Sequence, residues 1–236
     1  MPDSNQAADS YYSVSTGVSA DLECAWKCKR SVFLGSVVHV TTSEEVRAFL
    51  RTRTGLHKRA NHHCWAYRIH PPELSLQEFS SDAGEPAGSA GKPILGVLRS
   101  LDLRNLVVVV SRYFGGIQLG IRGLIDAYSH CTRKTLENVG ITLFSRGKEL
   151  ELDMDYATWN RVEVLLKKNA LPVLPDSLRF SDRVQVAFLV DRERWHEVEE
   201  LLQPFLRTAN GQIRWKEPER WIQRNAMDFF QEQGGA

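Results

Sequence analysis

Residues 106–110 constrain the fold of this chain more than any other segment. They read LVVVV, a continuous apolar run in which four of the five residues are valine. Such a run is typical of a strand that lies in the centre of a sheet with both faces buried. We therefore expect Leu106–Val110 to form the central strand of a sheet.

Two glycine-rich segments flank this strand. Residues 81–93 read SDAGEPAGSAGKP, and residues 111–123 read SRYFGGIQLGIRG. Glycine adopts positive φ angles and lets another backbone or a ligand approach closely. Loops carried by a rigid scaffold are also where binding and catalytic residues concentrate. The two segments therefore predict a functional site beside the central strand.

The hydrophobic pattern predicts an α+β protein with two domains. Residues 1–20 are rich in serine, alanine and aspartate, and we expect them to be flexible. A first domain covers residues 21–145, with a helix that begins at Thr42. The pattern then restarts over residues 146–216 as strand–helix–strand–strand–helix–strand, which is the order of a ferredoxin-like domain. Residues 217–236 are expected to form a helical tail.

The composition is that of a globular protein, with 42% hydrophobic and 25% charged residues. No apolar run approaches the roughly 20 residues that cross a bilayer, and residues 1–10 lack the apolar core of a signal peptide. We therefore expect a cytoplasmic protein that does not contact a membrane. The four cysteines are scattered without a zinc-binding pattern, so we expect free thiols, no metal and no cofactor.

The glycine-rich segments could bind an anion through their backbone amides, with help from Ser89 and Lys92. Their spacing does not match the phosphate loop of nucleotide hydrolases, because Pro93 follows the lysine where serine or threonine is required. The glycines at residues 115–123 likewise do not match the dinucleotide-binding fingerprint. The alternative is that all these glycines only form tight turns.

Residues 112–114, Arg-Tyr-Phe, lie at the end of the central strand, where open sheets often bind ligands. An arginine can hold a phosphate through two hydrogen bonds, and an exposed aromatic ring can stack on a base. The alternative is that the two rings close the edge of the core. A phosphate- or nucleic-acid-binding set is therefore predicted from seven residues: Lys92, Arg112, Tyr113, Gly115, Gly116, Arg122 and Ser89.

Carboxylates and histidines suggest further chemistry. Asp82 and Glu85 are three residues apart and could pair for acid–base work or bind Mg²⁺, although a capped turn explains them as well. His62 and His63 are adjacent, so in a strand they point to opposite faces and cannot serve one centre. A nucleophile formed by Cys64 and a neighbouring histidine is disfavoured for the same reason.

At these residues the chain resembles the IMPACT family, in particular its two-domain bacterial YigZ-like branch. The resemblance covers about residues 22–140 and rests on His62-His63-Cys64 and on residues 81–93 and 112–120. It implies a first domain like the second domain of ribosomal protein S5 and a second domain like the last domain (domain V) of elongation factor G. The loop signature comprises His62, His63, Asp82, Gly84, Glu85, Pro86, Gly88, Gly91, Pro93 and Gly120.

The chain departs from the family pattern at three places. Ala83 stands where a second aspartate is usual, which weakens a metal site formed by two carboxylates. Ile121-Arg122 replaces a small residue followed by glycine, and Asp126 replaces a basic residue. Arg122 could add a contact to phosphate, whereas Asp126 would repel one.

Three functions are open at this point. The first is a non-enzymatic cytoplasmic module that binds RNA or a ribosome-associated partner and regulates translation, as the resemblance to translation-type folds implies. The second is a hydrolase that acts on a phosphorylated small molecule through the Asp82/Glu85 loop and Arg112. The third is a protein-binding regulator that uses the ferredoxin-like sheet and the tryptophan-rich C-terminal part of the chain: Trp195, Trp215 and Trp221.

Overall fold

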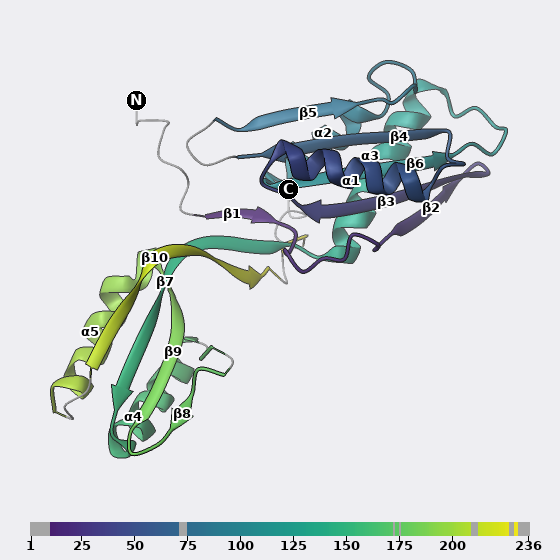
Figure 1. Ribbon diagram of the computed structural model, residues 1–236. Coiled ribbons are helices and arrows are strands. Elements are labelled where there is room, and N and C mark those ends of the chain that lie inside the picture. The colour runs from purple at the N-terminus through teal and green to yellow at the C-terminus, as the bar shows by residue number, and fades with distance from the viewer. Residues whose placement is uncertain are drawn as a thin grey trace, which may run out of the picture. The chain divides into compact units, whose positions relative to one another are not determined.

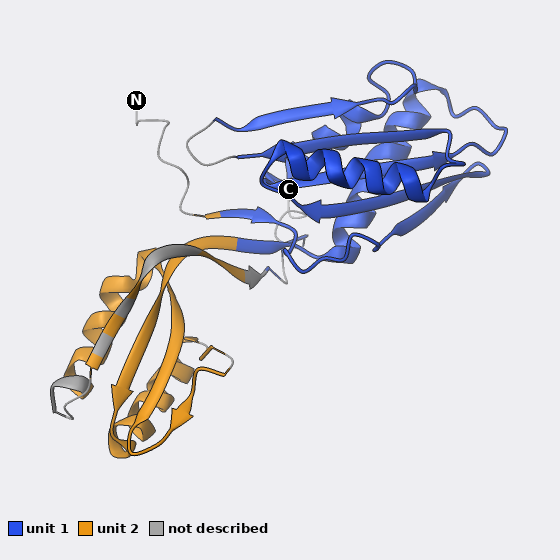
Figure 2. Ribbon diagram, viewed as in Figure 1, with its two compact units in different colours: residues 1–7, 11–143, 224–236 blue, residues 8–10, 144–223 orange. Residues whose placement is uncertain are grey.

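The computed structural model describes residues 10–70, 75–171, 173–174, 176–208, 212–226 and 229–230. The chain divides into two units, of which unit 1 takes residues 1–7, 11–143 and 224–236 and unit 2 takes residues 8–10 and 144–223 (Figure 2). The chain enters unit 2 within strand β7 (Thr142–Met154) and leaves it within strand β10 (Gln212–Asn225).

The first unit is built on a sheet of five strands with β6 in its centre. The order across the sheet is β2 (Cys24–Cys28), β3 (Ser31–His39), β6 (Leu106–Tyr113), β4 (His62–Ile69) and β5 (Gln77–Ser81). Strand β6 pairs antiparallel with β3 on one side and with β4 on the other. The prediction of a central strand at residues 106–110 is therefore confirmed.

Helices cover both faces of this sheet (Figure 1). Helices α2 (Gly91–Ser100) and α3 (Gly120–Val139) share one core with Val108 and Val110, whereas α1 (Ser43–Leu56) shares another with Val107 and Val109. Successive strand residues point to opposite faces. Strand β6 therefore needs apolar side chains at every position, which explains its continuous run.

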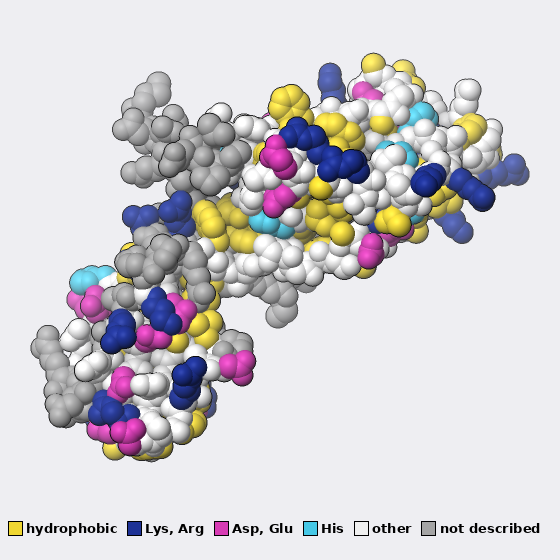
Figure 3. Space-filling model, viewed as in Figure 1, with side chains coloured by type: hydrophobic (Ala, Val, Ile, Leu, Met, Phe, Trp, Pro, Cys, Tyr) yellow, Lys and Arg dark blue, Asp and Glu magenta, His cyan; other side chains and the backbone are white. Residues whose placement is uncertain are grey.

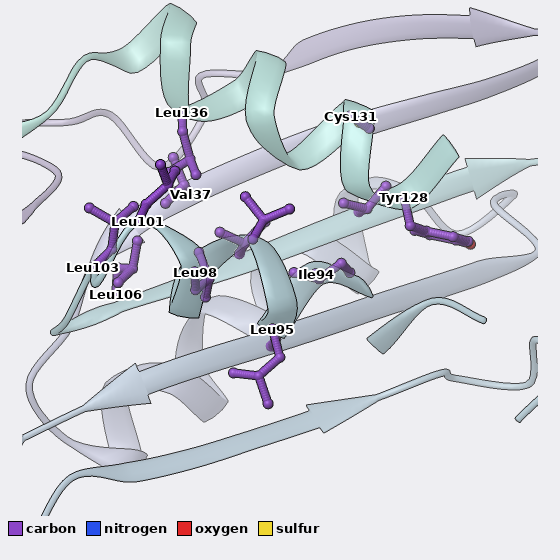
Figure 4. Close-up of a cluster of buried hydrophobic side chains, with 14 of the residues drawn as sticks. Val37, Ile94, Leu95, Leu98, Leu101, Leu103, Leu106, Tyr128, Cys131 and Leu136 are labelled. Carbon is purple, nitrogen blue, oxygen red and sulfur yellow. The ribbon is translucent and has the colours of Figure 1, made fainter. Parts of the chain in front are cut away.

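The core between α2, α3 and the sheet is the larger of the two in unit 1. Figure 4 shows side chains from both helices and from the strands meeting in this layer, among them Ile94, Leu98 and Leu136. Helix α3 comes very close to β3 at Gly35, where an added Cβ atom would lie 1.9 Å from Oγ1 of Thr135. Only glycine fits at this point of the sheet.

Helix α1 covers the opposite face only in part. It begins as predicted at Thr42, whose hydroxyl accepts from the amide of Glu45 while the Glu45 carboxylate accepts from the amide of Thr42. Hydrophobic side chains remain visible on this face beside the helix (Figure 3). Phe79 of β5, whose ring centroid lies 5.7 Å from that of Tyr67 in the core on the α1 side, is 59% exposed.

The second unit has the element order that the sequence predicts. After β7 come α4 (Tyr156–Lys168), β8 (Arg179–Phe180), β9 (Val184–Asp191), a 3₁₀ turn (Arg192–Arg194), α5 (Trp195–Thr208) and β10. Strand β9 pairs antiparallel with β7 and β8, and β10 also pairs with β7. Both units are thus mixed α/β, while their likeness to the named ribosomal and elongation-factor domains stays a prediction.

Two predictions about the ends of the chain are wrong. Ser10–Ser13 form strand β1, and Val14 is fully buried, so the flexible N-terminus does not extend over these residues. Residues 217–225 continue β10 instead of forming a helical tail, because Ile222 is buried and packs directly over Gly147. Residues 1–9, 227–228 and 231–236 lie outside the described residues.

Candidate functional site

A pocket of about 410 Å³ lies at one end of the sheet of unit 1. Four segments that are distant in the sequence line it: the start of β4, the first glycine-rich segment, the end of β6 and the start of α3. Both glycine-rich segments therefore meet at one place, as the sequence predicts. The residues that line this pocket are Asn61, His62, Glu85, Pro86, Arg112, Phe114, Gln118, Leu119, Gly120, Ile121 and Leu124.

A buried ion pair forms the floor of the pocket. Nη1 of Arg112 donates to Oε1 of Glu85 at 2.6 Å, and the hydroxyl of Tyr128 donates to the same oxygen at 2.8 Å. Nη2 of Arg112 lies 3.4 Å from Oγ of Ser31. Burial raises the pKa of Tyr128, so its hydroxyl keeps the proton that it donates to Glu85.

The structure gives Arg112 a partner other than the phosphate that the sequence predicts. Arg112 is only 4% exposed, and its charge is already compensated by Glu85. Its guanidinium lies over the rings of both Phe33 and Phe114, at 5.5 and 5.3 Å from their centroids. A phosphate at this place would have to displace a buried carboxylate, which is unfavourable.

His62 faces the pocket and stands opposite Arg112 in the pairing of β4 with β6. Its Nδ1 lies 3.0 Å from the carbonyl oxygen of Ala83, and its Nε2 lies 3.9 Å from Oε2 of Glu85. His63 bonds instead to Oγ of Ser111, through Nδ1 at 2.9 Å. Ser111 is the neighbour of Arg112, so it points to the other face of the sheet, as the alternation predicts.

Asp82 organises the first glycine-rich segment. Its carboxylate accepts from the backbone amides of Gly88, Ala90 and Gly91 at 2.8 to 3.0 Å. These amides are the donors that we expected to bind an anion, so the predicted anion cradle is already filled by a side chain. Asp82 is also unavailable as the partner of Glu85 in acid–base work, and the capped turn is the correct alternative.

Ser89 and Lys92 take different places in this segment. Ser89 is fully buried, and its hydroxyl donates to the carbonyl of Pro86 at 2.6 Å, so the structure does not support its predicted contact with phosphate. Lys92 is exposed on the first turn of α2. Pro93 lies in the same turn, where a helix does not need its amide.

In the second glycine-rich segment, Gly115 allows a close approach of two backbones. An added Cβ atom there would lie 2.0 Å from the carbonyl oxygen of Arg30. Four other glycines of the two glycine-rich segments have left-handed φ angles of +71° to +87°, which supports the alternative of tight turns for them: Gly84, Gly88, Gly116 and Gly120.

The aromatic and basic side chains of this segment separate in space. The hydroxyl of Tyr113 bonds to Nδ1 of His57 at 2.9 Å, and Tyr113 is not among the residues that line the pocket, so the structure does not support its predicted role in nucleic-acid binding at this pocket. Phe114 lines the pocket and is 45% exposed. Arg122 is highly exposed on α3 and forms an ion pair with Asp126 at 3.3 Å. Both residues depart from the family pattern, and their opposite charges compensate each other.

Tyr128 and Asn61 are site residues that the sequence analysis missed. The partners of Tyr128, Glu85 and Cys64, are 43 and 64 positions away in the sequence. The side chain of Asn61 accepts from the amide of Phe114 at 2.8 Å and so holds the second loop against β4. No local pattern indicates either role.

Cys64 lies under the floor of the pocket and is fully buried. Its thiol contacts the carbonyl of Asp82 at 2.9 Å and the hydroxyl of Tyr128 at 3.3 Å. Burial raises the pKa of Cys64 to about 12, and it raises the pKa of Cys131 to about 12 as well. Because the thiolate is the nucleophile, a catalytic role for Cys64 is disfavoured.

We expect iodoacetamide at pH 8 to alkylate the partly exposed Cys24 and Cys28 at least about 100-fold faster than the buried Cys64 and Cys131. Peptide mass spectrometry of a time course measures the four rates. The unfolded chain in urea is the control, in which all four cysteines should react alike. Equal rates for Cys64 and Cys28 in the folded chain would contradict the assignment of Cys64 as a buried structural thiol.

Unit 2 presents a second hollow, of about 620 Å³, along its strands. Its charged side chains have both signs, and Lys216 bonds to Glu149 and Glu151 at 2.8 and 2.6 Å. Of the tryptophans expected to bind a protein, Trp195 donates to the carbonyl of Val190, and Trp221 stacks with Arg146. The side chain of Trp215 lies outside the described residues.

Among the described residues, no group of three or more histidine, cysteine or acidic side chains is arranged to hold a metal ion. Within the same part of the chain, no helix is long and apolar enough to cross a bilayer.

Comparison with known proteins places the pocket within a domain of a known family. Residues 29–136 match the family model described as the Impact N-terminal domain. An IMPACT family member from Haemophilus influenzae is 38% identical over 146 residues, which is 62% of this chain and 71% of that protein. The IMPACT family member YvyE from Bacillus subtilis is 29% identical over 204 residues, 86% of this chain and 91% of that protein.

A crystal structure of a hypothetical protein shares 28% identity with this chain at a TM-score of 0.54, and the match covers 89% of this chain and 98% of that protein. The range that matches the family model contains every residue that lines the pocket and no residue of unit 2.

Proposed function

This chain belongs to the IMPACT family, and we propose that it is a binding module that takes up an unpaired nucleotide of RNA in the pocket of unit 1. Regulation of translation is the role that we propose for this binding, in line with the resemblance to folds of the translation apparatus. The observation that carries the proposal is the combination of a charged floor, apolar walls and an exposed aromatic ring in one pocket.

A nucleobase needs such a combination, because its faces are apolar and its edges carry donors and acceptors. The pocket supplies apolar walls from Pro86, Leu119 and Leu124, and the ring of Phe114 at its mouth. Glu85 and His62 supply polar atoms at the floor. The volume of about 410 Å³ lies in the range of ligand pockets in general.

The phosphate and sugar of the nucleotide would lie toward the start of α3. No side chain caps the first turn of this helix among the described residues, and Leu119, Gly120 and Ile121 of this region line the pocket. A helix N-terminus favours an anion. The exposed side chains of Lys92 and Arg122 lie on the two segments that border the pocket. Because few cations are present and the net charge is only +1, we expect a shallow dependence of affinity on salt.

We expect Phe114→Ala to weaken the binding of single-stranded RNA about tenfold, because the lost ring removes a stacking surface for one base. Fluorescence anisotropy with a labelled 12-nucleotide RNA of mixed sequence measures the dissociation constant. The matched control is Phe79→Ala, which removes an exposed ring from β5 outside the pocket and should leave the affinity unchanged.

Two results would count against RNA uptake at this pocket. One is that the wild-type chain does not retain the RNA at low salt. The other is that Phe114→Ala and Phe79→Ala bind with the wild-type affinity. The alternative function, a hydrolase, was expected to use the carboxylates of Asp82 and Glu85. It is less well supported, because the Asp82 carboxylate already accepts hydrogen bonds from three backbone amides.

A further inference from the structure

We propose that the pocket selects guanine among the four bases of RNA, through a pair of hydrogen-bond acceptors at its floor. This inference rests on the proposed uptake of a nucleotide. The two acceptors are Oε2 of Glu85 and Nε2 of His62, which lie 3.9 Å apart.

The carboxylate of Glu85 is only partly satisfied. Its side chain is 3% exposed, and both of its hydrogen bonds, from Arg112 and Tyr128, go to Oε1. Among the described residues, no hydrogen bond reaches Oε2, although Glu85 lines the pocket. Oε2 is not one of the fully buried side-chain atoms that lack a partner, so it is accessible from the pocket that Glu85 lines. A ligand that brings an N–H group can therefore donate a hydrogen bond to this charged oxygen.

The orientation of His62 makes its Nε2 the second acceptor. A carbonyl oxygen can only accept, so Nδ1 of His62 carries the hydrogen in its bond to the carbonyl of Ala83. In a neutral imidazole the other nitrogen is then an acceptor. The 3.9 Å between Nε2 and Oε2 of Glu85 is too long for a hydrogen bond between them, so both atoms are open to a ligand.

Two neighbouring acceptors distinguish the bases by the pattern of their pairing edges. Guanine presents two adjacent donors, N1–H and the N2 amino group, and can satisfy both acceptors. Adenine and cytosine place a ring acceptor beside their amino group, and uracil flanks its single N–H with two carbonyl oxygens. Each of these three would leave an acceptor of the pocket facing a lone pair, and unpaired buried polar atoms reject a ligand strongly.

The arginine side chain of a protein ligand also carries adjacent donors in its guanidinium group. Other features of the pocket favour a guanine nucleotide over such an arginine. The exposed ring of Phe114 offers a stacking surface at the mouth, and the uncapped start of α3 offers an anion site beside it. A guanine nucleotide uses the acceptor pair, the ring and the anion site together. An arginine side chain leaves the anion site unused.

The test changes atoms of the ligand, so the protein stays intact. Four labelled RNAs of nine nucleotides, U₄XU₄, carry guanine, hypoxanthine, 1-methylguanine or adenine at position X. Hypoxanthine lacks the N2 amino group, and 1-methylguanine lacks N1–H. We expect the guanine RNA to bind about 10- to 100-fold more tightly than the adenine RNA. The hypoxanthine and 1-methylguanine RNAs should both bind more weakly than the guanine RNA, because each lacks one of its two donors. Competition with free guanosine monophosphate shows whether the nucleotide alone suffices or the strand is needed.

His62→Ala should reduce the preference for guanine over adenine about tenfold, while His196→Ala on the exposed surface of α5 should leave it unchanged. If all four RNAs bind with equal affinity, guanine selection is wrong while RNA uptake stands. If none binds, the proposed function itself is wrong. If a short arginine peptide displaces the guanine RNA and guanosine monophosphate does not, the acceptor pair serves a protein ligand and the proposal is overturned.

Discussion

Replacing Arg112 with methionine is expected to lower the free energy of unfolding of unit 1 by about 3–5 kcal/mol. The substitution removes the only cation that bonds to Glu85 among the described residues and leaves a buried carboxylate without compensation. Tyr128 still donates to the same oxygen, but a neutral donor does not replace a charge. The loss should therefore exceed what the removed hydrogen bonds alone would cost.

A double variant separates the two causes of this loss. In Arg112→Met/Glu85→Gln the buried charge is absent, so the chain should be more stable than with Arg112→Met alone. Urea-dependent hydrogen exchange of peptides from β6 reports the stability of unit 1 separately from that of unit 2. Arg122→Met, which breaks an exposed pair on α3, is the control and should change little. A double variant as unstable as the single variant would show that packing of the arginine stem, and not charge, carries the effect.

Asp82→Ala is expected to lower the free energy of unfolding of unit 1 by about 2–3 kcal/mol at pH 7. The substitution leaves the amides of Gly88, Ala90 and Gly91 without their acceptor. The same loop carries Glu85, so the floor of the pocket should also become less ordered. RNA affinity should fall together with stability in this variant.

The contribution of Asp82 depends on pH in a defined direction. Burial by itself raises the pKa of Asp82, but the amides of Gly88, Gly91 and Ala90, with Lys92, outweigh it and hold the pKa below its usual range. A carboxylate with a lowered pKa stabilises the folded state fully above its ordinary pKa of about 3.9 and loses this effect as the pH falls through the folded-state value. The stability gap between wild type and Asp82→Ala should therefore narrow in acid.

Urea titrations at pH 7 and at pH 3 measure this gap. Asp126→Ala removes an exposed aspartate of α3 and serves as the control, for which no comparable gap is expected at either pH. A gap that stays constant down to pH 3 would mean that Asp82 acts through its shape and not through its charge.

Local patterns in the sequence were sufficient for most of the secondary structure. The valine run predicted the central strand, Thr42 predicted the start of α1, and the restart of the pattern at residue 146 predicted the element order of unit 2. The C-terminal part of β10 was missed, since Ile222 is buried only because it packs over Gly147 from a strand far away in the sequence.

The structure brings the two glycine-rich segments to one pocket, but several side chains of these segments make contacts that the sequence did not predict. The sequence by itself determined that two glycine-rich loops flank a buried strand, because backbone propensity and hydrophobic period are local properties. Only the tertiary structure decided that Arg112 faces Glu85, 27 residues away, and that Asp82 fills the expected anion cradle. Which charges meet depends on the pairing of strands distant in the chain, and desolvation then determines whether a charge binds a ligand or a neighbour.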